Sequence, residues 1–128
     1  MTILDTHSWI YWVSNPELLS AKALKFLNDS SSIGLSIISC LEVALLVEKQ
    51  KIELAYDIKV WMEKALSHEN LEVINLTPTL LIASTQLPGN FHQDPADRII
   101  AATCLLSNNV LITKDKKINK WGYIRTIW

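Results

Sequence analysis

The chain opens with MTILDTHSWIYWV (residues 1–13), which contains the first indications of its fold. A short aliphatic and β-branched run, Thr2 to Leu4, has the composition of a buried strand. Asp5 follows it directly, and apolar residues then recur at helical spacing until Pro16, which disfavours helical geometry in the residue before it. The opening of the chain therefore predicts a strand that passes into a helix at Asp5.

The same alternation of short β-branched runs and longer helical segments continues along the chain. It is typical of βα units around a mostly parallel sheet, so we predict an α/β fold with five strands. The expected strands are Thr2–Leu4, Gly34–Ser36, Glu72–Ile74, Val110–Thr113 and Arg125–Ile127. After the first helix, further helices are expected at Glu17–Asn28, Ser39–Gln50, Leu54–His68 and Ala96–Leu106.

Length and composition narrow the class of protein. With 128 residues, 49% of them hydrophobic, the chain is large enough for one sizeable core and too short for two ordinary domains, so we expect a single domain over residues 1–128. A net charge of −1 gives no overall basic field that would attract nucleic acid. No apolar stretch approaches the roughly 20 residues that span a bilayer, and the first residues lack the pattern of a secretory signal. We therefore expect a cytoplasmic protein that makes no contact with a membrane.

Four acids map to one edge of the predicted sheet. Asp5 follows the first strand, and Asp115 follows the fourth. Glu42 lies in the first turn of the helix expected after the second strand, and Asp97 lies in the first turn of the helix expected from Pro95. In a parallel α/β sheet, strand ends and the helix starts that follow them share one edge, where such folds bind ligands. We therefore expect these carboxylates to converge.

Each acid also has a purely structural interpretation. Ser39 and Glu42 fit a capping box, in which the glutamate reaches back to the serine backbone. Asp94 fits a helix cap with Pro95 at the first helical position. Asp5 fits a cap of the first helix, and Asp115 fits a solvated turn. These interpretations leave unexplained why all of the acids fall at the same edge.

Electrostatics favours a cation among these acids. Two carboxylates about 4 Å apart repel by roughly 4 kcal/mol at an effective dielectric constant near 20, so a cluster of four must take up protons or a cation. Oxygen ligands favour Mg²⁺ or Mn²⁺ over zinc. Such ions activate water for attack on a phosphodiester, either as a pair or as one ion with a carboxylate base, and the sequence leaves both arrangements open.

Four motifs resemble those of PIN-domain nucleases. Ile3-Leu4-Asp5-Thr6-His7 resembles the opening acid motif, and Ser39-Cys40-Leu41-Glu42 is similar to the second. The third is the most specific: His92-Gln93-Asp94-Pro95-Ala96-Asp97-Arg98-Ile99-Ile100-Ala101-Ala102-Thr103 resembles the motif of the toxin branch. Leu111-Ile112-Thr113-Lys114-Asp115 is similar to the fourth. The motifs follow one another in the family's order and cover nearly the whole chain.

The resemblance implies a three-layer α/β/α sandwich and a Mg²⁺- or Mn²⁺-dependent endoribonuclease. It implies a VapC-type toxin of a type II toxin–antitoxin system, usually a homodimer, which is silenced by a small antitoxin whose tail occupies the groove. Carried over residue by residue, it implies that the catalytic and metal-binding residues are Asp5, Glu42, Asp97 and Asp115. Asp94, one helical turn from Asp97, either joins them or only caps the helix.

Supporting residues surround this set in the sequence. We expect hydroxyl groups beside the acids to hydrogen-bond the carboxylates or bound water, namely Thr6, Ser39 and Thr113. Local basic residues are candidates for contacts with RNA phosphates, namely Lys114, Lys116, Lys117 and Arg98. The histidines, His92 included, show no ligand spacing and receive no metal role. The alternative to a nuclease is an inactive PIN-like module that binds nucleic acid or protein, which the loss of one of the four acids would indicate.

Overall fold

The computed structural model describes residues 1–128 and contains one five-stranded sheet. The strands are β1 (Thr2–Leu4), β2 (Ile33–Ser36), β3 (Leu71–Ile74), β4 (Val110–Ile112) and β5 (Arg125–Ile127). Their order across the sheet is β3-β2-β1-β4-β5, and every neighbouring pair runs parallel. The α/β prediction is thus confirmed, with a sheet that is entirely parallel rather than mostly so.

Seven α-helices connect and cover the strands. They are α1 (Thr6–Ser14), α2 (Ala21–Asn28), α3 (Ile38–Glu48), α4 (Ile58–Ala65), α5 (Pro78–Thr85), α6 (Pro95–Ser107) and α7 (Lys116–Trp121). A short 3₁₀ helix, Pro16–Leu18, lies between α1 and α2. None of the helices combines the length and the hydropathy that crossing a bilayer requires.

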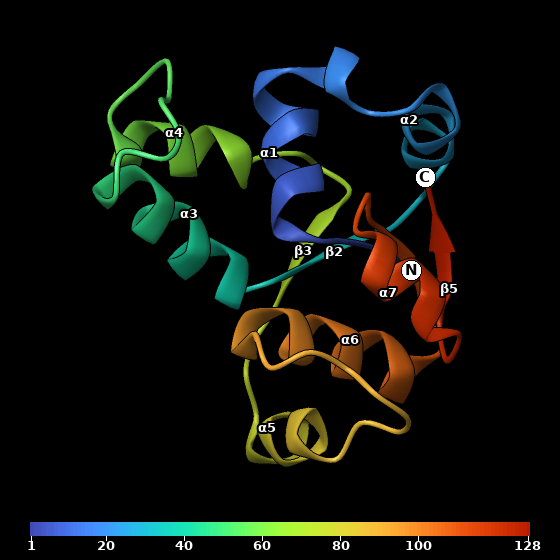
Figure 1. Ribbon diagram of the computed structural model, residues 1–128. Helices are drawn as coiled ribbons and strands as arrows, with labels where there is room; N and C mark the ends of the chain where they lie inside the picture. The colour runs from blue at the N-terminus through green and yellow to red at the C-terminus, as the bar shows by residue number, and fades with distance from the viewer.

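Helices cover both faces of the sheet, which gives the three layers that the resemblance implied (Figure 1). The larger core packs α1 to α4 against one face, where Leu4 of β1 and Ile112 of β4 point. Ile3 and Leu111, one residue earlier in each strand, point to the opposite face and contact α6 and α7. Successive side chains of a strand alternate between faces, so a single aliphatic run serves both cores.

The helix expected at Ala96–Leu106 is one residue longer at each end in the structure, as α6, and the other three expected helices differ more in their bounds. The segment expected as Glu17–Asn28 contains the 3₁₀ helix and then α2, because Ser20 caps α2 through a hydrogen bond from the Ala23 backbone amide to its hydroxyl. The segment expected as Leu54–His68 is helical only over α4, whose first turn is capped by Asp57. The third difference, at the start of α3, bears on the site and is described there.

Candidate active site

The carboxyl ends of the three central strands meet at one edge of the sheet. Leu4 pairs with Leu35 of β2 on one side and with Ile112 of β4 on the other, so the segments that leave these strands start side by side. A pocket of about 280 Å³ opens there. The residues that line it are Asp5, Thr6, His7, Tyr11, Glu42, Asp94, Asp97, Lys114 and Asp115. The structure therefore brings together the four acids selected from the sequence, and Asp94 with them.

Asp5 is the most buried acid of the pocket. It caps α1, because its Oδ1 accepts a hydrogen bond of 2.9 Å from the Ser8 backbone amide. The Ser8 hydroxyl in turn donates to the Ile112 carbonyl at 3.1 Å, which ties α1 to the end of β4. Burial raises the pKa of Asp5, although hydrogen bonds from Thr113 and Ser8 work in the opposite direction. The Asp5 carboxylate thus lies where burial makes its ionised form unfavourable.

Glu42 reaches the pocket from inside α3. The Thr6 hydroxyl donates to its carboxylate and also lies 2.9 Å from the buried Ser39 hydroxyl oxygen. Burial raises the pKa of Glu42; the bond from Thr6 lowers it, and the negative charges of Asp97 and Asp94 raise it further. The negative charges of these two acids therefore act directly on the Glu42 carboxylate.

The capping box expected for Ser39 and Glu42 is absent. The residue that precedes α3 is Ile37, and no side chain caps the helix from that position. The Ile37 amide instead bonds to the Ile74 carbonyl of β3, and the Ser36 hydroxyl accepts a 3.3 Å bond from the Ile38 amide. Strand pairing thus continues to Ile37 and the helix begins at once, which leaves Glu42 beyond the first turn with its carboxylate available to the pocket.

Asp94 and Asp97 occupy the start of α6. Asp94 caps the helix by accepting a 3.0 Å bond from the Ala96 amide, and it also lines the pocket, so the two roles weighed for it coexist geometrically. Asp97 lies in the first turn and contacts the His92 imidazole, with 2.7 Å between Oδ2 and Nε2. Burial raises the pKa of Asp97, the bond with His92 lowers it, and the charge of Asp94 raises it.

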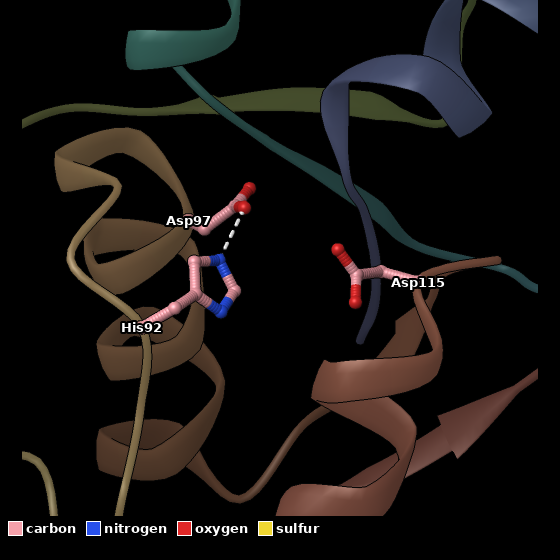
Figure 2. Close-up of side chains that lie close together, drawn as sticks. All are labelled: His92, Asp97 and Asp115. Atoms are coloured by element: carbon pink, nitrogen blue, oxygen red, sulfur yellow. Dashed lines mark hydrogen bonds and ion pairs between the residues drawn. The ribbon is translucent and has the colours of Figure 1, made fainter.

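Asp115 caps α7 from the opposite wall of the pocket. Its Oδ1 accepts hydrogen bonds from the backbone amides of Lys117 at 2.8 Å and Ile118 at 3.1 Å. Figure 2 shows its carboxylate turned toward Asp97 and His92 across the gap. One ligand atom from each of these three side chains lies within 4.8 Å of the other two.

Three helices thus begin at acids of one pocket, namely α1 at Asp5, α6 at Asp94 and α7 at Asp115. The amino-terminal end of a helix carries partial positive charge and free amide donors, which stabilise carboxylates. The structural interpretation of Asp5 and Asp94 as caps is therefore correct, whereas Asp115, expected in a solvated turn, is a helix cap as well. Capping does not compete with the convergence of these acids. The caps hold the carboxylates in fixed positions around the pocket.

The four basic residues proposed as substrate contacts separate in the structure. Lys114 lines the pocket, whereas Lys116 and Lys117 are exposed on the first turn of α7. Lys117 borders an adjacent cleft of about 290 Å³ that His92 also lines. Arg98 is different: its guanidinium donates to the backbone carbonyls of Ser84, Phe91 and His92 at 2.8 to 3.1 Å. A substrate role for Arg98 is not supported, since this side chain fastens the α5–α6 loop to α6.

The sequence-based selection missed three residues of the site. His7 and Tyr11 line the pocket from α1, and His92 contacts Asp97. The sequence did indicate the first two. His7 lies in the first turn of α1, two residues after Asp5, and Tyr11 lies one turn further along the same face of the helix. His92 carried no such signal, because its place depends on how the loop before α6 folds back.

The chain matches a known protein family over most of its length. The family model described as PIN domain matches residues 2–122 of the chain. The chain therefore belongs to the PIN-domain family. Within that family its similarity is to VapC proteins: Ribonuclease VapC22 of Mycobacterium tuberculosis is 30% identical over 128 residues, with 98% of this chain and 97% of that protein covered.

Solved structures of this fold include several toxin–antitoxin assemblies. DNA-bound VapBC from Salmonella typhimurium is similar with a TM-score of 0.71 and 21% identity, covering 98% of this chain and 96% of that one. A toxin–antitoxin complex from Klebsiella pneumoniae is similar with a TM-score of 0.68 and 21% identity, covering 100% and 97%. VapBC2 from Rickettsia felis, bound to a promoter DNA fragment, gives 0.65 and 18%, covering 98% and 96%. At these identities the likeness establishes the fold.

Proposed function

We propose that this protein is an endoribonuclease that hydrolyses RNA phosphodiester bonds with the help of Mg²⁺ or Mn²⁺, and that it is the toxin of a type II toxin–antitoxin pair. The observation that carries the proposal is the pocket lined by Asp5, Glu42, Asp97 and Asp115, which come from four distant parts of the chain. The 30% identity with a protein named as a ribonuclease supports the activity.

The donor set of the pocket fits a hard divalent cation. Carboxylate oxygens predominate, as Mg²⁺ and Mn²⁺ prefer, and no cysteine lines the pocket. Burial raises the pKa values of Asp5, Glu42 and Asp97, and neighbouring acids raise those of Glu42 and Asp97 further, so the ionised carboxylates are unfavourable here without a counter-charge. A bound divalent ion would activate a water molecule and neutralise negative charge on the phosphodiester.

The side chains of the pocket would then have different roles in binding the metal and the RNA. Asp5, Glu42, Asp97 and Asp115 would hold the ion or ions, and Asp94 would be an additional outer ligand. The hydroxyl of Thr6 orients Glu42, and hydrogen bonding from Thr113 orients Asp5, which keeps each carboxylate in one position. Lys114 lies in the same pocket and would hold an RNA phosphate beside the acids.

Phosphate contacts would continue along α7. Lys116 and Lys117 are exposed there, and the cleft that Lys117 shares with Lys120 adjoins the acidic pocket through His92. A local basic strip of this kind would bind the RNA backbone even though the whole chain has a net charge of −1. The RNA would thus cross the pocket and leave over the first turn of α7.

Partners follow from the same proposal. The solved structures of similar fold are toxin–antitoxin complexes, so a cognate antitoxin is the expected protein partner, and the cytoplasm, where RNA is available, is the expected place of action. We also propose a homodimer of single PIN domains. Exposed apolar side chains on α3 and α5 support it, including Leu41 at 53% and Ile82 at 58% exposure.

Cleavage of a labelled RNA by the purified protein tests the proposal. We expect no cleavage in EDTA and recovery when excess Mg²⁺ or Mn²⁺ is added. Glu42→Gln is expected to abolish cleavage, whereas Glu48→Gln, an exposed position on the same helix, is the matched control and is expected to stay active. Cleavage that persists in EDTA, or a fully active Glu42→Gln protein, would reject the metal-dependent mechanism. An inactive wild-type protein with every metal would favour the binding-module alternative.

A further inference from the structure

The acidic pocket has a nitrogen donor at its rim that the proposed metal ligands do not include. Nε2 of His92 lies 2.7 Å from Oδ2 of Asp97, and the two side chains are only 25% and 23% exposed. Asp115 completes the group from the opposite wall (Figure 2). The ligand atoms of the three residues lie within 4.8 Å of one another.

These separations suit coordination of one ion. Ligand atoms bonded to a cation at about 2.1 Å stand roughly 3 to 4 Å apart around it. The 2.7 Å contact between His92 and Asp97 is close to such an edge, and a carboxylate oxygen of Asp115 lies within 4.8 Å of both ligand atoms. The contact that is now a hydrogen bond would become one edge of the coordination sphere, with a cation in place of the shared proton.

The imidazole is held in place by contacts outside the pocket. Arg98, the residue after Asp97, donates to the backbone carbonyls of Phe91 at 3.0 Å and His92 at 3.1 Å. The Phe91 ring stacks on the imidazole, with 4.6 Å between centroids and 19° between planes. The loop that carries His92 is therefore fastened to the helix that carries Asp97, so the two groups face each other before any ligand arrives.

We propose that His92 is a metal ligand, and that with Asp97 and Asp115 it forms a mixed nitrogen and oxygen position that takes a divalent first-row transition ion in preference to Mg²⁺. The proposal rests on the proposed function, since it requires that the acids bind metal. The rest of the pocket offers oxygen ligands from Asp5 and Glu42, which suit Mg²⁺ and Mn²⁺ alike. Imidazole nitrogen suits transition ions and is a poor ligand for Mg²⁺.

The direct test is the Mn²⁺-loaded protein without RNA, examined by pulsed electron paramagnetic resonance for coupling between the ion and a directly bound nitrogen. We expect this coupling in the wild type and its loss in His92→Gln. His7→Gln is the stringent control, because His7 also lines the pocket, and His68→Gln is an exposed control remote from it. Both controls should keep the coupling. Coupling that survives in His92→Gln, or that disappears in His7→Gln, overturns the assignment.

Metal affinity supplies the second readout. By calorimetry, His92→Gln is expected to weaken Mn²⁺ binding by about tenfold or more and to change Mg²⁺ binding by less than about threefold. Equal loss for the two ions would contradict a nitrogen ligand. Thermal unfolding in EDTA checks that the variant is folded. If the wild type binds no Mn²⁺, both this inference and the proposed function fail; if it binds Mn²⁺ without nitrogen coupling, only this inference fails.

Discussion

Replacing Asp97 with asparagine should abolish RNA cleavage and make the metal-free protein more stable. Asparagine keeps the size of the side chain and an oxygen that accepts the hydrogen bond from His92, so packing and the α5–α6 loop are preserved. What the substitution removes is one negative charge from a pocket whose acids raise one another's pKa values. Activity and stability should therefore change in opposite directions.

The size of the stability gain follows from the spacing of the acids. Ligand oxygens of Asp97 and Asp115 lie within 4.8 Å, and two full charges at that distance repel by roughly 3.5 kcal/mol at an effective dielectric constant near 20. Solvent screening reduces this repulsion, the hydrogen bond with His92 weakens because its acceptor becomes neutral, and the loss of a favourable acid in the first turn of α6 costs about 0.5 kcal/mol. A net gain of about 1 to 2 kcal/mol corresponds to roughly 4 to 8 °C in Tm for a domain of this size.

Two assays on the same preparation decide the matter. Thermal unfolding in EDTA should give the higher Tm for Asp97→Asn, and added Mn²⁺ should stabilise the wild type more than the variant. RNA cleavage should fall by at least about 100-fold, since outer-shell substitutions alone cost up to that factor. Glu63→Gln, on the exposed side of α4, is the charge-matched control and should alter neither quantity. A variant that is less stable in EDTA would contradict the expected repulsion among the acids, and one that cleaves RNA normally would contradict a catalytic role for Asp97.

Three further outcomes are expected. Folding raises the pKa of Asp97 above its ordinary value of 3.8. The protonated Asp97 therefore contributes to stability below pH 3.8, and this contribution is lost as the pH rises through the raised pKa. In EDTA the Tm advantage of Asp97→Asn should accordingly be small near pH 4 and grow toward pH 8; an advantage independent of pH would contradict this. Lys117→Ala combined with Lys120→Ala should weaken binding of a non-cleavable RNA and reduce the slope of log affinity against log salt by about 1.4, measured by fluorescence anisotropy; an unchanged slope would remove both residues from the RNA path. Arg98→Ala should speed amide exchange around His92 in hydrogen-exchange measurements, because two hydrogen bonds to the loop and one to Ser84 of α5 are lost, and unchanged protection would show that the loop is held otherwise.

The central part of the fold was predictable because its signals are local. β-branched runs such as Thr2–Leu4 alternate their side chains between two cores, and Asp94 followed by Pro95 marks a helix start without any tertiary contact. The convergence of the acids was predictable from topology alone, since parallel strands end at a common edge.

The errors arose where tertiary contacts override local preference. The backbone hydrogen bond from the Ile37 amide to the Ile74 carbonyl makes α3 begin at Ile38. Ser39 is then already inside the helix, so the capping box suggested for Ser39 and Glu42 does not form. The contact of His92 with Asp97 depends on the bonds that Arg98 makes to the loop, and these connect atoms whose proximity no periodicity encodes. The same arginine, selected as a substrate contact because of its charge, serves instead to hold that loop.

A crystal of the protein soaked in Mn²⁺, with an anomalous difference map calculated at the manganese edge, would show whether the acids of the pocket bind a metal ion. We expect at least one strong peak inside the pocket, within bonding distance of carboxylate oxygens from Asp5, Glu42, Asp97 or Asp115. A map with no peak in that pocket, from crystals whose protein cleaves RNA in the presence of Mn²⁺, would contradict metal binding by these acids.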